Sequence, residues 1–569
     1  MKKIFLIMAL AISFVSCSDR IYKEINTDPT KADSINPASQ LSYAELQMYG
    51  DMSFVDVYRL YTYAFTQHLM GCWNTTNYGG QHRSNDNEMS RPWNNLYPGA
   101  IRNLTDAIDK TSRDSTMVNL QAAMRIFRVY VSGLLTDFYG DVPYSEAGLG
   151  ILNDNTRPAY DKQEDIYYDF FDELKAAVKL FDSKAEKIST DPLFEGNIQK
   201  WKIFANSLRL RYALRISYVD PTKAQTEIEA AIADGVMQSK ADNACVKHMN
   251  ITFSFGQESY RDVRGNALSK YFYGNDPTNH QSYICKTFWD QLYDNNDPRT
   301  TRLFRFYIDD YMATTSPEGR IDMTDSVVAT QRAYPDKEIV QPVAPGNFSY
   351  KPWPNYPDDL AGTALAAAVE EVQAVHPDFN PKDNPRWLKP KLANNFMHSD
   401  NPGVLMTYAE VCFLQAEAAS RGLGASGAPQ WYEKGIREAM AFLSDYYNCT
   451  LINEQEIADY LNEPNIAWNA GDQKKQLEQI NTQAWILHFH NPAEAWANVR
   501  RTGYPKLTPP TGDDEYPIID GAEIPVRLCY PLNEERYNGE NNAAAKRRVP
   551  GIYDWHAPVW WDVNEKLGN

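Results

Sequence analysis

The sequence predicts a mainly α-helical fold of stacked helical hairpins, with long irregular loops and little β-structure. The first supporting observation is periodicity. In residues 119–140, Met124, Phe127, Val131 and Phe138 recur at helical intervals, as the buried face of a helix requires. The second is that such segments follow one another in adjacent pairs. Paired helices of this kind bury their apolar faces against the next pair.

Helical periodicity recurs in several segments along the chain. The segment 119–140 ends at Gly140, which is a natural stop for a helix. Residues 164–183 and 200–218 repeat the same apolar spacing. Two further stripes are formed by Tyr408, Cys412, Ala416 and Ala419, and by Ile436, Met440, Leu443 and Tyr447 in a helix that starts at Trp431.

The helical periodicity is interrupted in the region from about residue 300 to about residue 400. The stretch "YPDKEIVQPVAPGNFSYKPWPNYPDDLAG" is rich in Pro, Gly and Tyr and shows no helical stripe. We therefore expect a loop-rich insertion here, and long loops in compact proteins are often functional. The C-terminal part is also rich in turns, with one short strand expected from Ile524 to Leu528.

The N-terminus predicts export and lipidation. Two lysines precede an apolar run from Ile4 to Val15, which ends at Ser16-Cys17. This run is too short to span a bilayer and is typical of a secretory signal. We expect residues 1–16 to be a lipoprotein signal peptide, Cys17 to be lipidated, residues 17–30 to be a tether and residues 31–569 to be one domain. The alternative is an ordinary signal with an incidental cysteine.

Composition limits the partners. The formal charge of −18 disfavours nucleic acid, whose phosphates repel an acidic surface. The cysteines are few and show no C-x-x-C, which argues against a disulfide scaffold or a zinc ribbon. The chain has 36 Tyr but 23 Phe, and aromatic rings with a polar group suit binding surfaces.

Four stretches resemble catalytic, nucleotide-binding or metal sites. In "LLTDFYGDVPYSEA", residues 134–147, Asp137, Asp141 and Glu146 raise the question of a glycosidase carboxylate pair, although a helix end followed by a turn explains the same residues. The sequence Gly422-x-Gly424-x-x-Gly427 follows a helix, so it suits a hairpin loop better than a nucleotide site. His488-x-His490 and "YDNNDPR", residues 293–299, are better explained as polar positions at helix ends. We expect no cofactor. The alternative for residues 293–299 is a structural calcium site.

The chain resembles the SusD/RagB-like outer-membrane nutrient-binding lipoproteins of Bacteroidetes, in the SusD-like branch that opens with N-x-D-P. The resemblance rests on pieces that occur in order behind the lipidation signal: "INTDPTK", "WNNLYPGAIRNLTDAI", "LLTDFYGDVPYSEA", "YDNNDPR", "LMTYAEVCFLQAEAASRG", "AWANVRRTGYP" and "IPVRLCYPLNEERYNGEN". Members that reach the cell surface often carry several acidic residues after the lipidated Cys. Here Ser18-Asp19-Arg20 follows Cys17.

The resemblance implies a SusD-like fold, which is mainly α with tetratricopeptide-like helical hairpins and irregular loops that form a ligand face. It also implies a protein that is not an enzyme. It implies a lipid-anchored protein on the exterior of the outer membrane, which captures oligosaccharides or polysaccharides and delivers them to a SusC-like TonB-dependent transporter. It also implies that Asp137 and Asp141 belong to the helical framework. The alternatives are a member that captures peptides, a surface glycoside hydrolase, and a lid that contacts only the transporter.

Two loops combine flat aromatic rings with side chains that hydrogen-bond sugar hydroxyls. The first contributes Trp73, Asn74, Tyr78, Gln81 and Arg83, and the second contributes Tyr350, Trp353 and Tyr356. Prolines in the second loop favour an extended, preorganised backbone. We expect these eight residues to bind the ligand. The alternatives are that Trp73 folds back onto the core and that the second loop packs against the helical body or the transporter.

Overall fold

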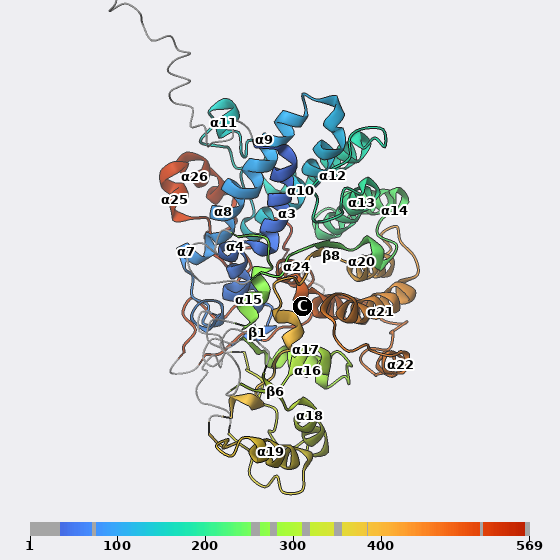
Figure 1. Ribbon diagram of the computed structural model, residues 1–569. Coiled ribbons are helices and arrows are strands. Elements are labelled where there is room, and N and C mark those ends of the chain that lie inside the picture. The colour runs from blue at the N-terminus through green and yellow to red at the C-terminus, as the bar shows by residue number, and fades with distance from the viewer. Residues whose placement is uncertain are drawn as a thin grey trace, which may run out of the picture.

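The computed structural model describes residues 35–70, 75–251, 262–273, 282–309, 319–345, 355–383, 385–512 and 516–563. The described part is mainly helical and its strands are only two to four residues long, so the predicted fold class is confirmed (Figure 1). One buried apolar cluster extends from Ala38 to Trp561 and joins most of the helices. No helix in the described part is long and apolar enough to cross a membrane.

Helix α10, Val118–Tyr139, lies at the centre of the N-terminal half and is buried along most of its length. It ends at Gly140, as predicted, where φ is +84° and the amide N–H bonds to the carbonyl of Thr136. The neighbouring helices α12, Gln163–Leu180, and α13, Ile198–Arg215, pack beside it. Gly133 allows the close approach of α13, because a Cβ there would lie 2.3 Å from the Tyr212 hydroxyl.

The helical hairpins stack along one side of the molecule, on the right in Figure 1. Helix α13 pairs with α14, Pro221–Asp234, and α20, Tyr408–Ser420, pairs with α21, Ala428–Tyr447. Helix α23, Gln473–Leu487, packs on α20 and leads to α24, Pro492–Thr502. The three glycines of the G-x-G-x-x-G stretch all have positive φ between α20 and α21. They form a hairpin loop, as the sequence predicts.

Many of the remaining helices lie on the left in Figure 1, whereas α22, Glu454–Leu461, lies near α21 on the right. Helix α3 packs on both α9 and η3. The elements are α3 Pro37–Gly50, α4 Met52–Val57, η1 Tyr58–Thr62, α5 Tyr63–Phe65, η2 Thr76–Gly80, α7 Asp86–Met89, α8 Arg91–Leu96, η3 Tyr97–Ile101, α9 Arg102–Thr111, η4 Ser115–Met117, α11 Gly150–Asn153, η5 Lys240–Asp242, α15 Ala267–Tyr273, α22 Glu454–Leu461, η9 His488–His490, α25 Leu532–Tyr537 and α26 Gly539–Arg548.

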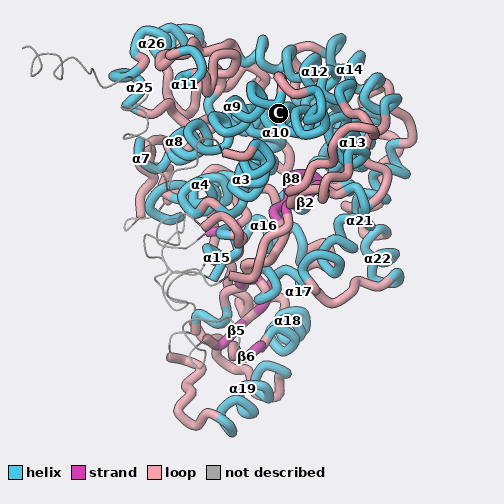
Figure 2. The backbone as a smooth tube through the Cα atoms, turned by 45° about the horizontal axis from the view of Figure 1, so that its top comes forward, coloured by secondary structure: helices cyan, strands magenta, loops and turns pink. Residues whose placement is uncertain are grey.

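The described part of the chain contains three small antiparallel sheets among the helices (Figure 2). The largest has the order β1-β3-β7-β4, with Leu69 opposite Ile284, Tyr283 opposite Lys391 and Phe304 opposite Leu392. The strands are β1 Leu69–Met70, β2 Ala244–Val246, β3 Tyr283–Ile284, β4 Phe304–Arg305, β5 Tyr307–Ile308, β6 Ile321–Asp322, β7 Lys391–Leu392 and β8 Gly403–Met406. The other two sheets are β2-β8 and β5-β6.

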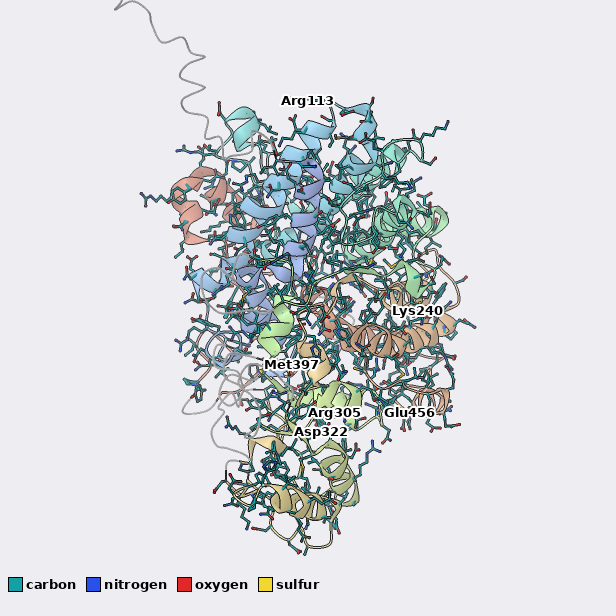
Figure 3. The ribbon with its side chains drawn as sticks, viewed as in Figure 1. Arg113, Lys240, Arg305, Asp322, Met397 and Glu456 are labelled. Atoms are coloured by element: carbon teal, nitrogen blue, oxygen red, sulfur yellow. The ribbon has the colours of Figure 1, made fainter. Side chains whose placement is uncertain are left out.

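The region from about 300 to 400 is less irregular than the sequence predicts. Its described part contains α18, Thr324–Ala333, and α19, Ala364–Val375, which form a lobe below α16, Lys286–Tyr293, in Figure 1. The two helices are joined by a 3.0 Å hydrogen bond from the Leu365 amide to the Thr330 hydroxyl. The shorter elements here are α17 Thr300–Leu303, η7 Arg386–Leu388 and η8 Asn394–Met397. Arg305 and Asp322 form an ion pair at 3.3 Å near the junction (Figure 3).

The predicted strand from Ile524 to Leu528 is wrong. These residues are extended but do not form a ladder. The amides of Val526 and Arg527 both bond to the carbonyl of Trp555, whereas the Leu528 amide bonds to the carbonyl of Phe138. The apolar residues of the segment 524–528 are therefore buried against several elements, and the segment does not pair with one strand.

Candidate ligand-binding face

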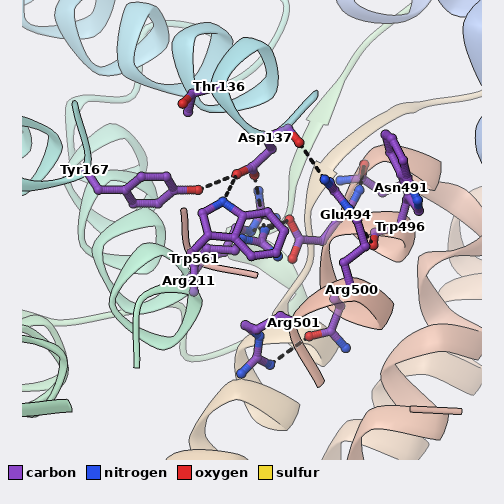
Figure 4. A network of polar contacts seen from close by, with 12 residues as sticks. Thr136, Asp137, Tyr167, Arg211, Asn491, Glu494, Trp496, Arg500, Arg501 and Trp561 are labelled. Atoms are coloured by element: carbon purple, nitrogen blue, oxygen red, sulfur yellow. Dashed lines mark hydrogen bonds and ion pairs between the residues drawn. The ribbon is translucent and has the colours of Figure 1, made fainter. Parts of the chain in front are cut away.

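The carboxylates of "LLTDFYGDVPYSEA" each have a structural partner. Asp137 accepts hydrogen bonds from the Tyr167 hydroxyl at 2.5 Å and from the Trp561 indole N–H at 2.9 Å (Figure 4). Asp141 accepts from the Gln163 amide at 2.8 Å and forms an ion pair with Arg548 at 2.5 Å.

Glu146 completes this set. It caps a nearby loop by accepting from the Asn155 side chain at 3.0 Å and from the Ala159 amide at 2.8 Å. None of the six contacts given for these three carboxylates joins one carboxylate to another, so the described geometry supports a framework role. A glycosidase pair needs two carboxyl groups that face one ligand.

Buried ion pairs tie these helices together. Arg211 forms a 2.6 Å pair with Glu410, and Arg215 forms a 2.6 Å pair with Glu494 (Figure 4). Arg501 of α24 holds both oxygens of Glu417 in α20. Burial alone raises the pKa of Glu417, but the nearby Arg501 and Arg421 outweigh it and lower the pKa to about 2. The charged residues of the core thus fix the scaffold.

The other two motifs are also structural. His490 is buried and stacks on Tyr447 with the ring centres 4.8 Å apart. Burial lowers the pKa of His490 to about 3. In "YDNNDPR", Asp297 forms a buried ion pair with Arg299 at 2.6 Å, and Asn295 donates to the Gln291 carbonyl. Across the described ranges there is no group of three or more His, Cys, Asp or Glu side chains placed to hold a metal ion.

The structure describes four of the eight predicted ligand residues. Tyr78, Gln81 and Arg83 lie on or just after η2, and Tyr356 lies near the C-terminal end of the second loop. Outside the described residues lie Trp73, Asn74, Tyr350 and Trp353, together with the lipidation residue Cys17.

The three residues near η2 differ in exposure. Tyr78 is half-buried, with its ring centre 6.1 Å from that of Tyr61, and Arg83 is exposed. Gln81 is only 4% exposed, and its side-chain N–H donates to the Pro517 carbonyl at 3.1 Å. In this conformation Gln81 holds the loop in place, while Arg83 and one edge of Tyr78 face the surface.

Tyr356 lies in a separate aromatic group. It is half-buried, and its ring centre lies 6.0 Å from that of Trp387. Burial raises its pKa. Among the described contacts, none joins Tyr356 directly to Tyr78, Gln81 or Arg83, so the structure does not bring these four side chains into one cluster.

The roots of the two predicted loops nevertheless meet at strand β3. On one side, Met70 of β1 pairs with Tyr283. On the other side, the Val343 amide donates to the Ile284 carbonyl at 3.2 Å and the Val343 carbonyl accepts from the Lys286 amide at 2.8 Å. Met70, Tyr283 and Val343 also share a small buried cluster. Both loops therefore leave the body of the protein from adjacent positions.

A groove of about 510 Å³ beside this region was not predicted. Trp289 and Tyr293 of α16 line it with stacked rings, 5.2 Å apart at an interplanar angle of 20°. Gln331, Gln341 and Lys389 also line it. The spacing of Trp289 and Tyr293, four residues apart on one helix, is the sequence signal that marks this face.

Comparison with known proteins gives consistent results. The SusD-like family model, described as starch-binding and associating with the outer membrane, matches residues 29–340 and 372–531. A SusD-like protein of Bacteroidetes AC2a is 63% identical, with a TM-score of 0.89, covering 93% of this chain and all of that one. A chitin-binding protein is 32% identical, with a TM-score of 0.72 and the same coverage.

More distant structures show the same fold. A chitin-binding SusD homologue from Flavobacterium johnsoniae is 22% identical, with a TM-score of 0.67, covering 93% of this chain and 99% of that one. Comparison with curated protein sequences gives no match. With a family model that matches most of its length, this chain belongs to the SusD-like family of starch-binding proteins that associate with the outer membrane.

Proposed function

We propose that the protein is a non-catalytic, lipid-anchored receptor on the cell exterior. It captures oligosaccharides or polysaccharides and delivers them to a SusC-like TonB-dependent transporter. The lipid is attached at Cys17, and the ligand binds across the two loops that contain Trp73, Tyr78 and Arg83 on one side and Trp353 and Tyr356 on the other.

The observation that carries this proposal is the common root of both loops at β3, where Met70 and Val343 flank the same strand. Two aromatic segments that leave from one place can approach the same sugar chain from two sides. Flat rings stack on the apolar faces of sugars, and polar side chains bind the hydroxyls. The relatives that bind chitin make chitin and starch the first ligands to test.

Affinity gel electrophoresis of residues 18–569 across a polysaccharide panel tests the proposal. We expect retardation by at least one neutral glycan, which is recovered at its original length. Replacing both Trp73 and Trp353 by Ala is expected to weaken glycan binding by about tenfold or more, because the stacking of a sugar on each aromatic ring contributes on the order of 1 kcal/mol. The control is Tyr537→Ala, which removes a 60% exposed ring on α25.

Three other outcomes of this experiment would contradict parts of the proposal. Shortened glycan would contradict the non-catalytic assignment. Retardation by no glycan, with binding of peptides instead, would replace glycan capture by peptide capture. Unchanged affinity in the double variant, with normal helical circular dichroism, would move the site away from these loops.

The anchor has its own test. Cys17→Ser in the full chain is expected to abolish incorporation of radiolabelled palmitate and to release the protein from the outer-membrane fraction. Retention in that fraction without label would contradict lipid anchoring through Cys17.

A further inference from the structure

The groove beside α16 lies between this helix and residues 335–342. The stacked Trp289 and Tyr293 form its apolar wall. Asn355, a described residue of the second predicted loop, also lines it. The groove therefore adjoins the second of the loops to which the proposed function assigns glycan binding.

Most polar side chains of the groove already have partners. Lys286 forms an ion pair with Asp290. The ammonium of Lys337 donates to the Asp359 carbonyl at 2.6 Å, and the amide of Gln331 bonds to backbone groups of residues 337–340. The other acidic residues, Asp294 and Glu338, are exposed to water, where charges are well screened.

Lys389 is the exception among these charged groups. It is only 8% exposed, yet within the described ranges its ammonium has no carboxylate or carbonyl partner. Its one described contact is with the ring of Tyr283, whose centre lies 5.8 Å from Nζ. Burial without a counter-charge lowers the pKa of Lys389 to about 8.

A buried cation of this kind is costly to the fold. The free energy of desolvating an ammonium is recovered only when an opposite charge approaches it in the same low-dielectric place. A carboxylate or sulfate in the groove would form short charge-assisted hydrogen bonds with Nζ. Tyr293, which is half-buried, lies on the same wall and offers aromatic surface to the sugar ring that carries the anion.

We infer that this groove is a subsite for a negatively charged substituent of the glycan, a carboxylate or a sulfate, which is held by Lys389 while its sugar ring packs on Tyr293. The inference rests on the proposed function and adds to it a preference for acidic glycans.

Isothermal titration calorimetry with three probes tests this subsite. Trigalacturonic acid carries the carboxylates, its methyl ester carries the same sugars without charge, and a sulfated carrageenan tetrasaccharide carries the sulfates. We expect at least one acidic probe to bind about tenfold or more tightly than the methyl ester, as for other buried charge-assisted contacts. Which acidic probe binds identifies the substituent.

Two matched variants locate the effect. Lys389→Met is expected to abolish the preference for the acidic probe and to raise Tm, because it removes an uncompensated buried charge but keeps the side-chain volume. Lys286→Met changes a lysine of the same groove that already has a carboxylate partner, so it is expected to keep the preference. Binding of neutral polysaccharide should be the same in both variants.

Two results overturn the inference. One is a wild-type protein that binds neutral polysaccharide but shows no preference for either acidic probe. The other is a preference that survives in Lys389→Met. Both leave glycan capture intact, whereas failure of every glycan in the panel, neutral and acidic, would reject the proposed function itself.

Discussion

Replacing Glu417 by Gln removes the negative half of a buried ion pair between two helical hairpins. Glu417 of α20 is 1% exposed, and Arg501 of α24 donates to its two oxygens at 2.5 and 2.6 Å. Arg421 adds a third contact at 3.0 Å. Gln keeps the shape of the side chain but not its charge. It leaves the buried Arg501 guanidinium with only neutral acceptors, chiefly Asn498 at 2.7 Å.

The pKa of Glu417 sets the size of the effect. It falls from an ordinary 4.5 to about 2 in the folded protein, which corresponds to about 3 kcal/mol of stability. A carboxylate with a lowered pKa stabilises the fold above the unfolded pKa of 4.5, and this stabilisation is lost as pH falls towards 2. It should be about 3 kcal/mol at pH 7 and about 1 kcal/mol at pH 3.

Differential scanning calorimetry measures this effect. The entropy of unfolding is about 2.1 cal/mol/K per residue, or about 1 kcal/mol/K for a chain of this size, so Glu417→Gln should lower Tm by about 3 °C at pH 7. The control is Glu433→Gln on the neighbouring helix α21, where a 52% exposed Glu pairs with Arg437. Its effect should be below about 0.5 kcal/mol. Equal melting of both variants, or a difference that does not shrink at pH 3, would refute the reasoning.

Two further substitutions test the core and its charges. Burial is the main cause, and the nearby Asp191 the second, that raises the pKa of Glu45 well above 4.5. The stability of the wild-type protein should therefore fall as pH rises above 4.5. Glu45→Gln should be more stable than wild type at pH 7 and should have the same melting temperature as wild type below pH 4.5. Gly133→Ala places a Cβ 2.3 Å from the Tyr212 hydroxyl; although Ala favours helices, overpacking should lower the free energy of unfolding by about 1 to 3 kcal/mol in urea titrations. An unchanged pH dependence in the first variant, or a more stable second variant, would contradict these arguments.

The helical framework could be predicted because its signals are local. The end of α10 at Gly140 and the hairpin loop at Gly422 follow from the φ that glycine permits and from apolar periodicity. The strand predicted from Ile524 failed for the opposite reason. Its apolar residues bond to backbone groups of Trp555 and Phe138, which lie elsewhere in the chain, and no local pattern reveals such partners.

The candidate site was less accessible to sequence reasoning. Composition selected two loops, and the structure shows that Met70 and Val343 at their roots are neighbours of one strand. Exposure, however, depends on tertiary contacts. Gln81 reads as a ligand residue but is buried against Pro517, whereas Lys389 reads as an ordinary lysine but is buried without a counter-charge.

The division between core and loops has a consequence for how ligand preference can change. The helices are joined by buried ion pairs such as Arg211–Glu410, whose loss leaves an uncompensated charge. The loops instead leave from Met70 in β1, a strand of two residues, and from Val343, whose backbone is joined to Ile284 and Lys286 by two hydrogen bonds. Substitutions in the loops therefore alter few contacts of the scaffold. A change of ligand in this fold should accordingly require changes near β3 and α16 and leave the ion-paired core intact.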